Sequence, residues 1–274
     1  MARQYFHMHL VSDATGETLN TVARAAAANY ANFQPLEHIY ALVRTAKQLA
    51  RVLSEIERQP GIVLFTLVDA HLRQQLEQKC LELNIPAISI LDPVIASLAA
   101  YLGAQYKPQV AAQHQLNANY FKRIAALNYT MMHDDGQNPE TINQAEVILI
   151  GVSRSSKTPT SIYLAHRGIK TANIPIVPTI EPPKTLFEMK APLIVALIST
   201  ADRIAQIRRH RLLGLNEQRE TSYIDKQEIT AELLYVKKLC QEYSWPMIDV
   251  TRRSVEETAA AVINLLTEKK YAQQ

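Results

Sequence analysis

Two things that this sequence lacks limit the classes of protein it can encode. Cysteine is scarce: Cys80 and Cys240 lie far apart and outside any Cys-x-x-Cys or Cys/His pattern, so we predict neither a disulfide nor a zinc site. Apolar runs are short, and none approaches the roughly 18 residues of a membrane-spanning helix. Residues 1–4 lead into a predicted strand rather than a signal peptide. We therefore expect a cytoplasmic protein with no membrane partner.

An excess of charge of one sign is also missing. The chain has 29 Lys and Arg against 26 Asp and Glu, and its net charge of +3 is dispersed. Proteins that bind nucleic acid usually gather basic residues in a patch or stripe, so we expect no nucleic-acid partner. With 274 residues, 47% of them hydrophobic, the chain has an ordinary globular composition and the length for one large or two ordinary domains.

Strand and helix patterns alternate along most of the chain. Predicted strands lie at residues 5–11, 37–43, 61–68, 87–91, 147–150, 173–178, 193–198 and 245–250. Predicted helices separate them, among them 46–57, 70–83, 118–132, 202–213 and 226–243, while 103–117 is predicted to be a connection. This alternation implies βαβ units. We predict an α/β protein of two halves with mostly parallel sheets, residues 1–136 and 145–274, with the boundary at 137–144.

A phosphate-binding loop is predicted where the apolar strand 147–150 ends. Its residues are Gly151, Val152, Ser153, Arg154, Ser155, Ser156, Lys157 and Thr158, and a helical pattern follows them. The backbone N–H groups of such a loop and of the helix N-terminus face one anionic group. Lys157 adds a positive charge for the outer phosphates, and the Thr158 hydroxyl can reach a magnesium ion. These eight residues are the predicted nucleotide site of the C-terminal half.

The match to the common P-loop pattern G-x-x-x-x-G-K-[ST] is incomplete. Ser156 stands where the second glycine belongs, and serine tolerates a positive φ less well than glycine. Ordinary P-loop enzymes also have an apolar strand ending in Asp downstream of the lysine, to hold magnesium. Here the strand that fits best, 61–69, lies upstream, so a common NTPase motor or small-molecule kinase is a poor fit. The plainer alternative is a serine-rich turn with a solvated lysine.

Three acidic residues are candidates for acid–base work. Asp13 lies in the segment 12–18, at the carboxyl end of the first predicted strand, where ligands of α/β proteins bind. Helix capping explains that segment equally well. Asp134 and Asp135 follow His133 shortly before the loop and could supply a general base or a metal ligand. A solvated helix end is the commoner explanation for them.

Histidine and arginine pairs give weaker signals. His7 and His9 share one face of the first strand, but no third metal ligand is visible, so packing or exposure is the better explanation. Arg208 and Arg211 share a helix face and could bind phosphate, although a basic solvated helix is equally consistent.

Taken together, these segments resemble the bifunctional regulatory proteins of pyruvate, phosphate dikinase and of phosphoenolpyruvate synthase. The matching segments run in family order from residue 12 to about 260: 12–18, 133–136, 151–159, 163–165, 172–175, 207–211 and 249–258. The Ser-Arg-x-x-Lys-Thr-Pro core is the most specific of them, because proline rarely follows a phosphate loop directly. It is tolerated there because a first-turn N–H has no helical partner.

The resemblance implies two opposed activities. Members of the family transfer phosphate from ADP to a threonine of the target and so inactivate it; they remove it with inorganic phosphate and release pyrophosphate. The threonine lies beside the target's catalytic histidine, which is phosphorylated when the kinase acts. Synthase regulators usually have glycine where this chain has Ser156, so the sequence resembles the dikinase branch, with pyruvate, phosphate dikinase as the expected protein partner.

Roles for the candidate residues follow as hypotheses. We expect the loop amides to bind the diphosphate of ADP, with Lys157 on its terminal phosphate, Arg154 on the transferring group and Mg²⁺ as cofactor. Asp134 or Asp135 would orient the threonine hydroxyl, and Asp13 competes for that role. Arg208, Arg211 and Arg252 are candidates for binding inorganic phosphate. A homodimer is expected because two-fold dimers are the commonest assemblies. The alternatives are the same chemistry on phosphoenolpyruvate synthase, and a non-catalytic ADP sensor.

Overall fold

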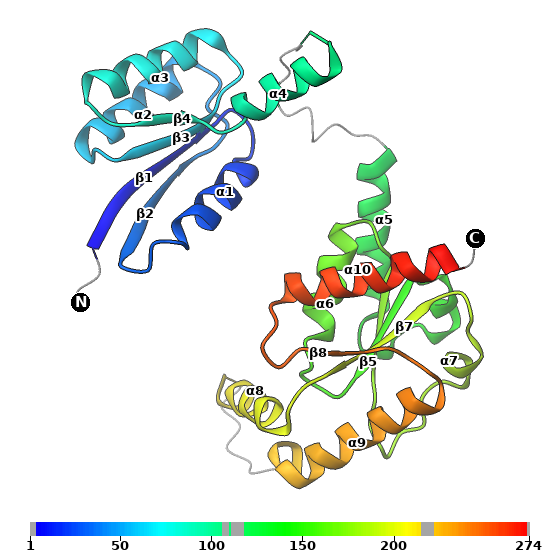
Figure 1. The fold of residues 1–274 in the computed structure, drawn as a ribbon. Coiled ribbons are helices and arrows are strands. Elements are labelled where there is room, and N and C mark those ends of the chain that lie inside the picture. Colours follow the sequence, from blue (N-terminus) through cyan, green and yellow to red (C-terminus); the bar gives the residue numbers. More distant parts are fainter. Residues whose placement is uncertain (1–3, 106–109, 111–117, 215–221, 273–274) are drawn as a thin grey trace. The chain divides into compact units, whose positions relative to one another are not determined.

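A computed structural model describes residues 4–105, 110, 118–214 and 222–272. The chain divides into two compact units, residues 1–115 and 116–274, and each is built on one four-stranded parallel sheet (Figure 1). The predicted α/β class with two parallel-sheet halves is therefore confirmed. Most of the predicted connection 103–117 lies outside the described residues. Among the helices of the described part, none combines the length and apolar character needed to cross a membrane.

The first unit has strand order β2-β1-β3-β4. Its elements are β1 (Gln4–Ser12), α1 (Glu17–Ala27), β2 (Phe33–Tyr40), α2 (Ala46–Arg58), β3 (Ile62–Thr66), α3 (Ala70–Glu82), β4 (Ala87–Ser89) and α4 (Asp92–Leu102). Helix α1 covers one face of the sheet through Leu19 and Ala23, and α2 and α3 cover the other through Leu49 and Leu76 (Figure 1). Side chains of the central strand β1 point alternately to the two faces of the sheet, so the strand contributes to the hydrophobic core on each face.

The second unit has strand order β6-β5-β7-β8. Its elements are α5 (Ala118–Met132), the 3-10 helices η2 (Asp134–Gly136) and η3 (Pro139–Gln144), β5 (Val147–Gly151), α6 (Lys157–His166), β6 (Thr171–Pro175), α7 (Lys184–Glu188), β7 (Leu193–Ile198), α8 (Ala201–Gly214), η4 (Ser222–Ile224), α9 (Lys226–Glu242), β8 (Met247–Asp249) and α10 (Val255–Ala272). Helices α6 and α10 pack on one face and α9 on the other.

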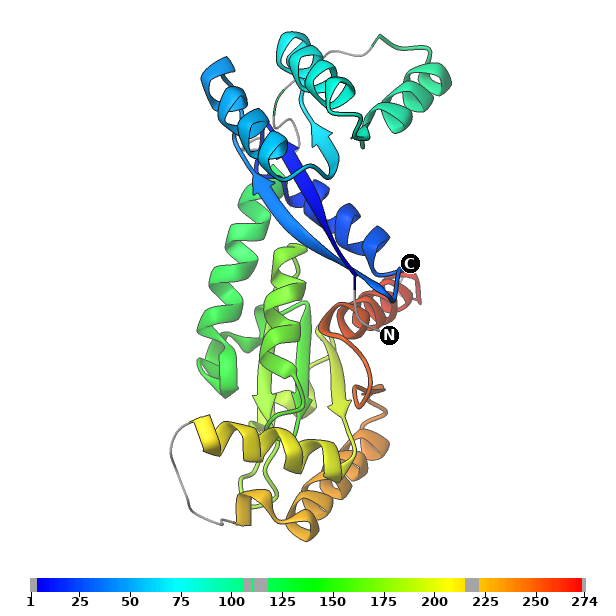
Figure 2. The ribbon, with the colours of Figure 1, turned by 90° about the vertical axis from the view of Figure 1, so that its left-hand side faces the viewer.

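The central strand β5 carries the site. It is buried throughout because both its faces and both its edges are covered, which explains its uninterrupted apolar sequence. Strands β6 and β7 lie on opposite sides of it, so its carboxyl end is the topological switch point at which α/β sheets bind ligands. The arrowheads of this sheet point toward helix α8 in Figure 2, so the loop after β5 and helix α8 share the ligand-binding edge.

Helix α5 belongs to the second unit, so the boundary lies earlier than the predicted 137–144. Strand β6 is an edge strand, and the end of α5 supplies partners for its N–H groups. The amide of Thr171 donates to the Thr130 hydroxyl at 3.1 Å, and the amide of Asn173 to the carbonyl of His133 at 3.0 Å. The polar segment 137–144 contains the 3-10 helix η3, which the buried Ile142 anchors, and is not a linker.

Strand β2 also begins earlier than the predicted 37–43. Strand β2 pairs with β1 from Gln4↔Phe33 to Val11↔Tyr40, so it begins and ends where β1 offers backbone partners. The same register brings His38 beside His9, a neighbour that the sequence analysis did not find. His9 is buried, donates to the Gln59 carbonyl at 2.8 Å and bonds the Tyr40 hydroxyl at 3.2 Å. Both ring nitrogens of His9 thus make hydrogen bonds within the unit, which agrees with packing rather than metal binding as the role of this histidine.

Candidate functional site

The loop between β5 and α6 begins with a glycine that no other residue can replace. Gly151 has φ 147°, and a Cβ built there would lie 2.5 Å from the Leu197 carbonyl oxygen and 2.9 Å from the Ser155 hydroxyl. The neighbouring strand β7 therefore passes too close for any side chain. Glycine lets the chain leave the sheet at this point and turn toward α6.

For the ADP site that the resemblance implies, we expect Gly151→Ala to displace the loop and weaken ADP binding at least tenfold. We also expect a loss of about 2–4 kcal/mol in the free energy of unfolding from overpacking and strain. Gly103→Ala is the matched control, because Gly103 also has a positive φ of 58° but nothing within 4 Å of the added Cβ. Its cost is the left-handed backbone alone, about 1–2 kcal/mol. Isothermal titration with ADP and thermal unfolding of both variants test this. Equal effects of the two substitutions would contradict the steric argument.

Two further loop residues have left-handed backbone conformations. Arg154 has φ 72°, and Ser156, at the N-cap of α6, has φ 63°. Left-handed residues within a short turn bring successive N–H groups to one concave side, which is the backbone geometry of anion-binding nests. Position 156 does need the positive φ that a glycine would supply at lower cost, and serine adopts it here.

Lys157 lies at the start of α6 and is 5% exposed. Its ammonium group donates to the carbonyls of Gly151 at 3.1 Å and Val152 at 3.0 Å, so it lies inside the loop rather than in solvent. Burial lowers the pKa of Lys157 to about 8, against the opposing charges of Asp135 and Asp134. The solvated-lysine alternative is therefore wrong.

For the ADP site that the resemblance implies, the lowered pKa of Lys157 predicts that binding depends on pH. The free protein holds Lys157 charged below pH 8 and increasingly neutral above it, whereas a bound diphosphate requires the charged form. Above about pH 8 the affinity for ADP should fall, by up to tenfold per pH unit, while ADP itself stays fully ionised. Titrations at pH 7, 8, 9 and 10 measure this, with adenosine as the uncharged control. An ADP affinity that is flat over this range would contradict the buried-lysine account.

Asp134 contacts the residue that was expected to reach magnesium. Its Oδ1 accepts from the Thr158 hydroxyl at 3.0 Å and from the Asn173 amide, whose nitrogen also donates to the Thr158 oxygen at 3.0 Å. Ordinary P-loop enzymes have a downstream strand for such an acid. Here it comes from η2, upstream of the loop, and Asn173 on β6 fixes its position.

Asp135 has a different environment from its neighbour. It is exposed, has a left-handed backbone with φ 51°, and lines a pocket of about 290 Å³. The other residues lining that pocket are Ser153, Arg154, Ser156, Lys157, Thr158, Pro159, Pro175 and Ile207. The structure thus brings five of the eight predicted loop residues and one predicted acid to one cavity, with Arg154 exposed at its edge.

Comparison with known proteins shows the family of this chain. A family model described as Kinase/pyrophosphorylase matches residues 8–263. The chain belongs to this family. A relative from Afipia carboxidovorans is 55% identical over 274 residues (98% of this chain, 97% of the relative), and one from Bradyrhizobium sp. is 57% identical over 267 residues (97% and 96%). A third, from Caulobacter vibrioides, is 56% identical over 263 residues (96% and 84%). All three are provisionally named pyruvate, phosphate dikinase regulatory proteins.

The first unit of this kinase/pyrophosphorylase holds Asp13. Helix α1 has Gly16 at its N-cap position with no side-chain cap hydrogen bond, so neither Ser12 nor Asp13 caps this helix. The Asp13 carboxylate instead accepts from the Val68 amide at 2.7 Å, which joins the loops after β1 and β3, and burial raises its pKa. Asp13 also lines a pocket of about 300 Å³ at the carboxyl ends of these strands, together with Arg44 and Asp69.

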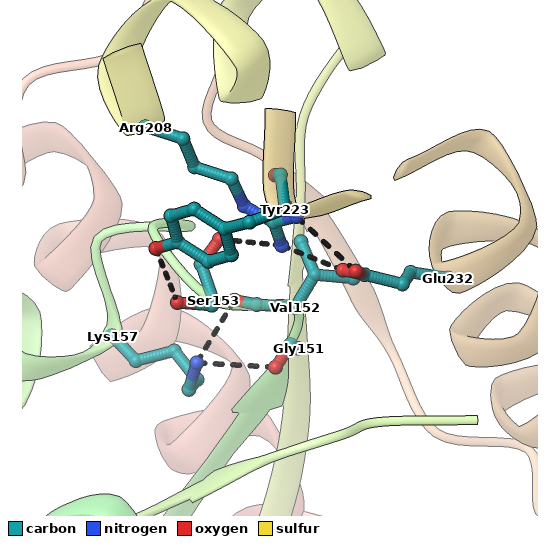
Figure 3. Close-up of polar contacts among 7 residues, drawn as sticks. All are labelled: Gly151, Val152, Ser153, Lys157, Arg208, Tyr223 and Glu232. Carbon is teal, nitrogen blue, oxygen red and sulfur yellow. Dashed lines mark hydrogen bonds and ion pairs between the residues drawn. The ribbon is translucent and has the colours of Figure 1, made fainter. Parts of the chain in front are cut away.

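The hypothesis that Arg208 binds inorganic phosphate is wrong, because its side chain is buried and already paired. Arg208 is 1% exposed and its terminal N–H groups donate to Glu232, Tyr223 and Ser153 (Figure 3). Arg211 and Arg252 are exposed. The sequence analysis assigned no role to Asn173, although it lies in the matching segment 172–175, and did not find Tyr223 or Glu232. One signal was available for Glu232, because it lies three residues after Ile229 and four before Val236 and so shares the buried face of α9.

Proposed function

We propose that this protein is a bifunctional regulator of pyruvate, phosphate dikinase. Its kinase activity converts ADP and a threonine hydroxyl of the dikinase to AMP and phosphothreonine. Its phosphorylase activity converts phosphothreonine and inorganic phosphate to threonine and pyrophosphate. The observation that carries the proposal is a single pocket with a buried lysine inside a phosphate loop and an exposed carboxylate, Asp135, on its wall. The family is described as both a kinase and a pyrophosphorylase, and the relatives are named as regulators of pyruvate, phosphate dikinase; both support the proposal.

The phosphate loop binds the diphosphate of ADP. Its left-handed residues, Arg154 and Ser156, direct N–H groups toward one anion, and Lys157 places a positive charge at the terminal phosphate. The Arg154 side chain is exposed at the pocket edge and stabilises the phosphoryl group during transfer. Phosphoryl transfer needs little covalent help from the protein, so positioning and charge supply most of the acceleration.

Magnesium fits the Asp134 and Thr158 side chains. Their carboxylate and hydroxyl oxygens are the hard donors that Mg²⁺ prefers, and the ion is usually held by one or two carboxylates together with substrate phosphates. When bound, it would neutralise charge on the diphosphate. Asn173 keeps both side chains in place through its amide nitrogen. Asp134 is thus assigned to the metal side of the site, rather than to the threonine substrate.

Asp135 is assigned to the threonine of the target. Its carboxylate is exposed in the pocket, where it orients the incoming hydroxyl and accepts its proton as the phosphoryl group is transferred. In the phosphorolysis direction the same group returns a proton to the threonine oxygen. The phosphoryl group of phosphothreonine then occupies the position of the terminal phosphate of ADP, and inorganic phosphate attacks it from the position that the α-phosphate of ADP occupies in the forward reaction. We further propose that the protein acts as a cytoplasmic homodimer.

Incubation with purified pyruvate, phosphate dikinase, ADP and phosphoenolpyruvate tests the function, with phosphothreonine read by mass spectrometry. We expect one phosphothreonine beside the catalytic histidine of the dikinase, and none when ATP replaces ADP. Phosphothreonine on phosphoenolpyruvate synthase alone would overturn the choice of target and leave the mechanism. ADP binding without phosphothreonine on either enzyme would favour the non-catalytic sensor.

A further inference from the structure

One residue that bonds the loop after β5 lies outside the pocket. Arg208, on helix α8, is almost completely buried, yet it does not line the cavity. Its Nη1 donates to the Tyr223 carbonyl at 2.9 Å and to Glu232 Oε1 at 3.1 Å; its Nη2 donates to Glu232 Oε2 at 2.6 Å and to the Ser153 carbonyl at 3.3 Å. The remaining Nε–H is buried and has no partner among the described residues.

Tyr223 completes the arrangement around Ser153. The Arg208 guanidinium lies over the Tyr223 ring, 4.4 Å from its centre, and the Tyr223 hydroxyl is 3.2 Å from the Ser153 hydroxyl (Figure 3). Ser153 is therefore held twice, at its carbonyl by Arg208 and at its side chain by Tyr223. The buried Arg208 guanidinium has a bidentate bond to the Glu232 carboxylate and lies over the Tyr223 ring, so its position is fixed.

The position of the Ser153 carbonyl decides the direction of the next amide. In a trans peptide the C=O and the N–H of the same unit point in opposite directions. Because Arg208 fixes the Ser153 carbonyl toward α8 and α9, the N–H of Arg154 is directed away from them. Arg154 lines the phosphate pocket, whereas Arg208 and Glu232 do not. Loss of this constraint would allow the peptide to turn over and present a carbonyl oxygen to the phosphate.

We propose that Arg208, held by Glu232 and Tyr223, is a positioning residue that orients the Ser153–Arg154 peptide for diphosphate binding. The proposal rests on the proposed function, because it assigns the loop to the diphosphate of ADP. On this proposal, the preference of the site for a diphosphate over a monophosphate depends on Arg208, Glu232 and Tyr223, which do not touch the nucleotide. Arg208 acts only through the loop and is no ligand of the substrate.

The decisive readout is the ratio of the dissociation constants for AMP and ADP. A substitution that only loosens the unit weakens both nucleotides together. Loss of the peptide orientation weakens ADP and free pyrophosphate selectively, so the ratio falls. We expect the wild-type protein to bind ADP at least tenfold more tightly than AMP, and Tyr223→Phe to reduce that ratio two- to fivefold, because it removes only the hydroxyl that contacts Ser153.

Arg208→Met alone leaves Glu232 unpaired and can unfold the unit, so the main variant is the double substitution Arg208→Met with Glu232→Met, which removes the ion pair as a whole. We expect it to remain folded by circular dichroism and to lose at least tenfold in ADP affinity while AMP affinity changes less than threefold. Arg209→Met, an exposed arginine on the same helix, is the control and should leave both constants unchanged.

The outcomes separate this inference from the function it rests on. A folded double variant that keeps the wild-type ratio, with Tyr223→Phe also unchanged, would overturn the positioning role. If the double variant unfolds, Tyr223→Phe decides alone, since it leaves the ion pair intact. A wild-type protein that binds AMP as tightly as ADP would instead refute the diphosphate site itself.

Discussion

Replacing Lys157 with methionine is expected to weaken ADP binding at least a hundredfold and to reduce phosphothreonine formation on the dikinase more than a thousandfold. The substitution keeps an unbranched side chain as far as the ε position and removes the ammonium group that lies inside the loop. Losses of this size are typical when a preorganised charge is removed from a water-excluded site. Isothermal titration and a quantitative phosphothreonine assay measure the two effects.

The same variant should be more stable than the wild type. The pKa of Lys157 is lowered from 10.5 in the unfolded chain to about 8 in the folded one, so the stability linked to this group is present above pH 10.5 and lost as the pH falls toward 8. At neutral pH its full cost is present, up to about 3 kcal/mol. The carbonyls of Gly151 and Val152 also accept from the amides of Ile176 and Ser155, so neither is left without a donor.

Thermal unfolding at pH 7 measures this gain, and Lys184→Ala, at an exposed position on α7, is the control that should change neither stability nor activity. A Lys157→Met protein that is both inactive and unfolded would show that the lysine holds the loop together, contrary to our account. An active and more stable variant would remove Lys157 from the phosphate site altogether.

Substitution of Asp135 by asparagine is expected to reduce turnover by two to three orders of magnitude and to leave ADP affinity within about threefold of wild type. The carboxylate faces the pocket and is assigned to the threonine hydroxyl, so its loss affects proton transfer rather than nucleotide binding. Asparagine preserves size and hydrogen-bonding ability while removing the basic oxygen. Rates at saturating ADP, together with titrations, separate the two effects.

Asp134→Asn serves as the comparison because the neighbouring acid has different contacts. Asp134 bonds Thr158 and Asn173, so its loss should weaken magnesium-dependent ADP binding as well as turnover. If the two variants behaved alike, the division of roles between these residues would be wrong. Full activity of Asp135→Asn would leave Asp134 and Asp13 as the remaining acids among the three candidates.

The phosphate loop could be predicted from sequence because all its determinants are local. The strand Val147–Gly151, the small residues after it and the lysine at the helix start follow one another without interruption. The positive φ at Ser156 was also foreseeable, since the common motif has glycine at that position.

Features that depend on residues distant in sequence could not be predicted in this way. The sequence offered Asp134 and Asp135 alike as a general base or a metal ligand, and the contact of Asp134 with Thr158 depends on Asn173, which lies on β6. Arg208 was a candidate phosphate ligand because its real partner could not be seen in the sequence. That partner, Glu232, lies 24 residues away on another helix. The boundary was misplaced because the polar sequence of 137–144 concealed one buried anchor, Ile142.

We propose that one protein both adds the terminal phosphate of ADP to the dikinase and removes it as pyrophosphate. ADP labelled with ³²P in its β-phosphate tests it directly: the label is first transferred to the dikinase, the nucleotide is removed, and unlabelled phosphate is then added. We predict that label appears on threonine in the first step and in pyrophosphate in the second. Label released as inorganic phosphate would show hydrolysis instead, and label that never reaches the dikinase would contradict the account.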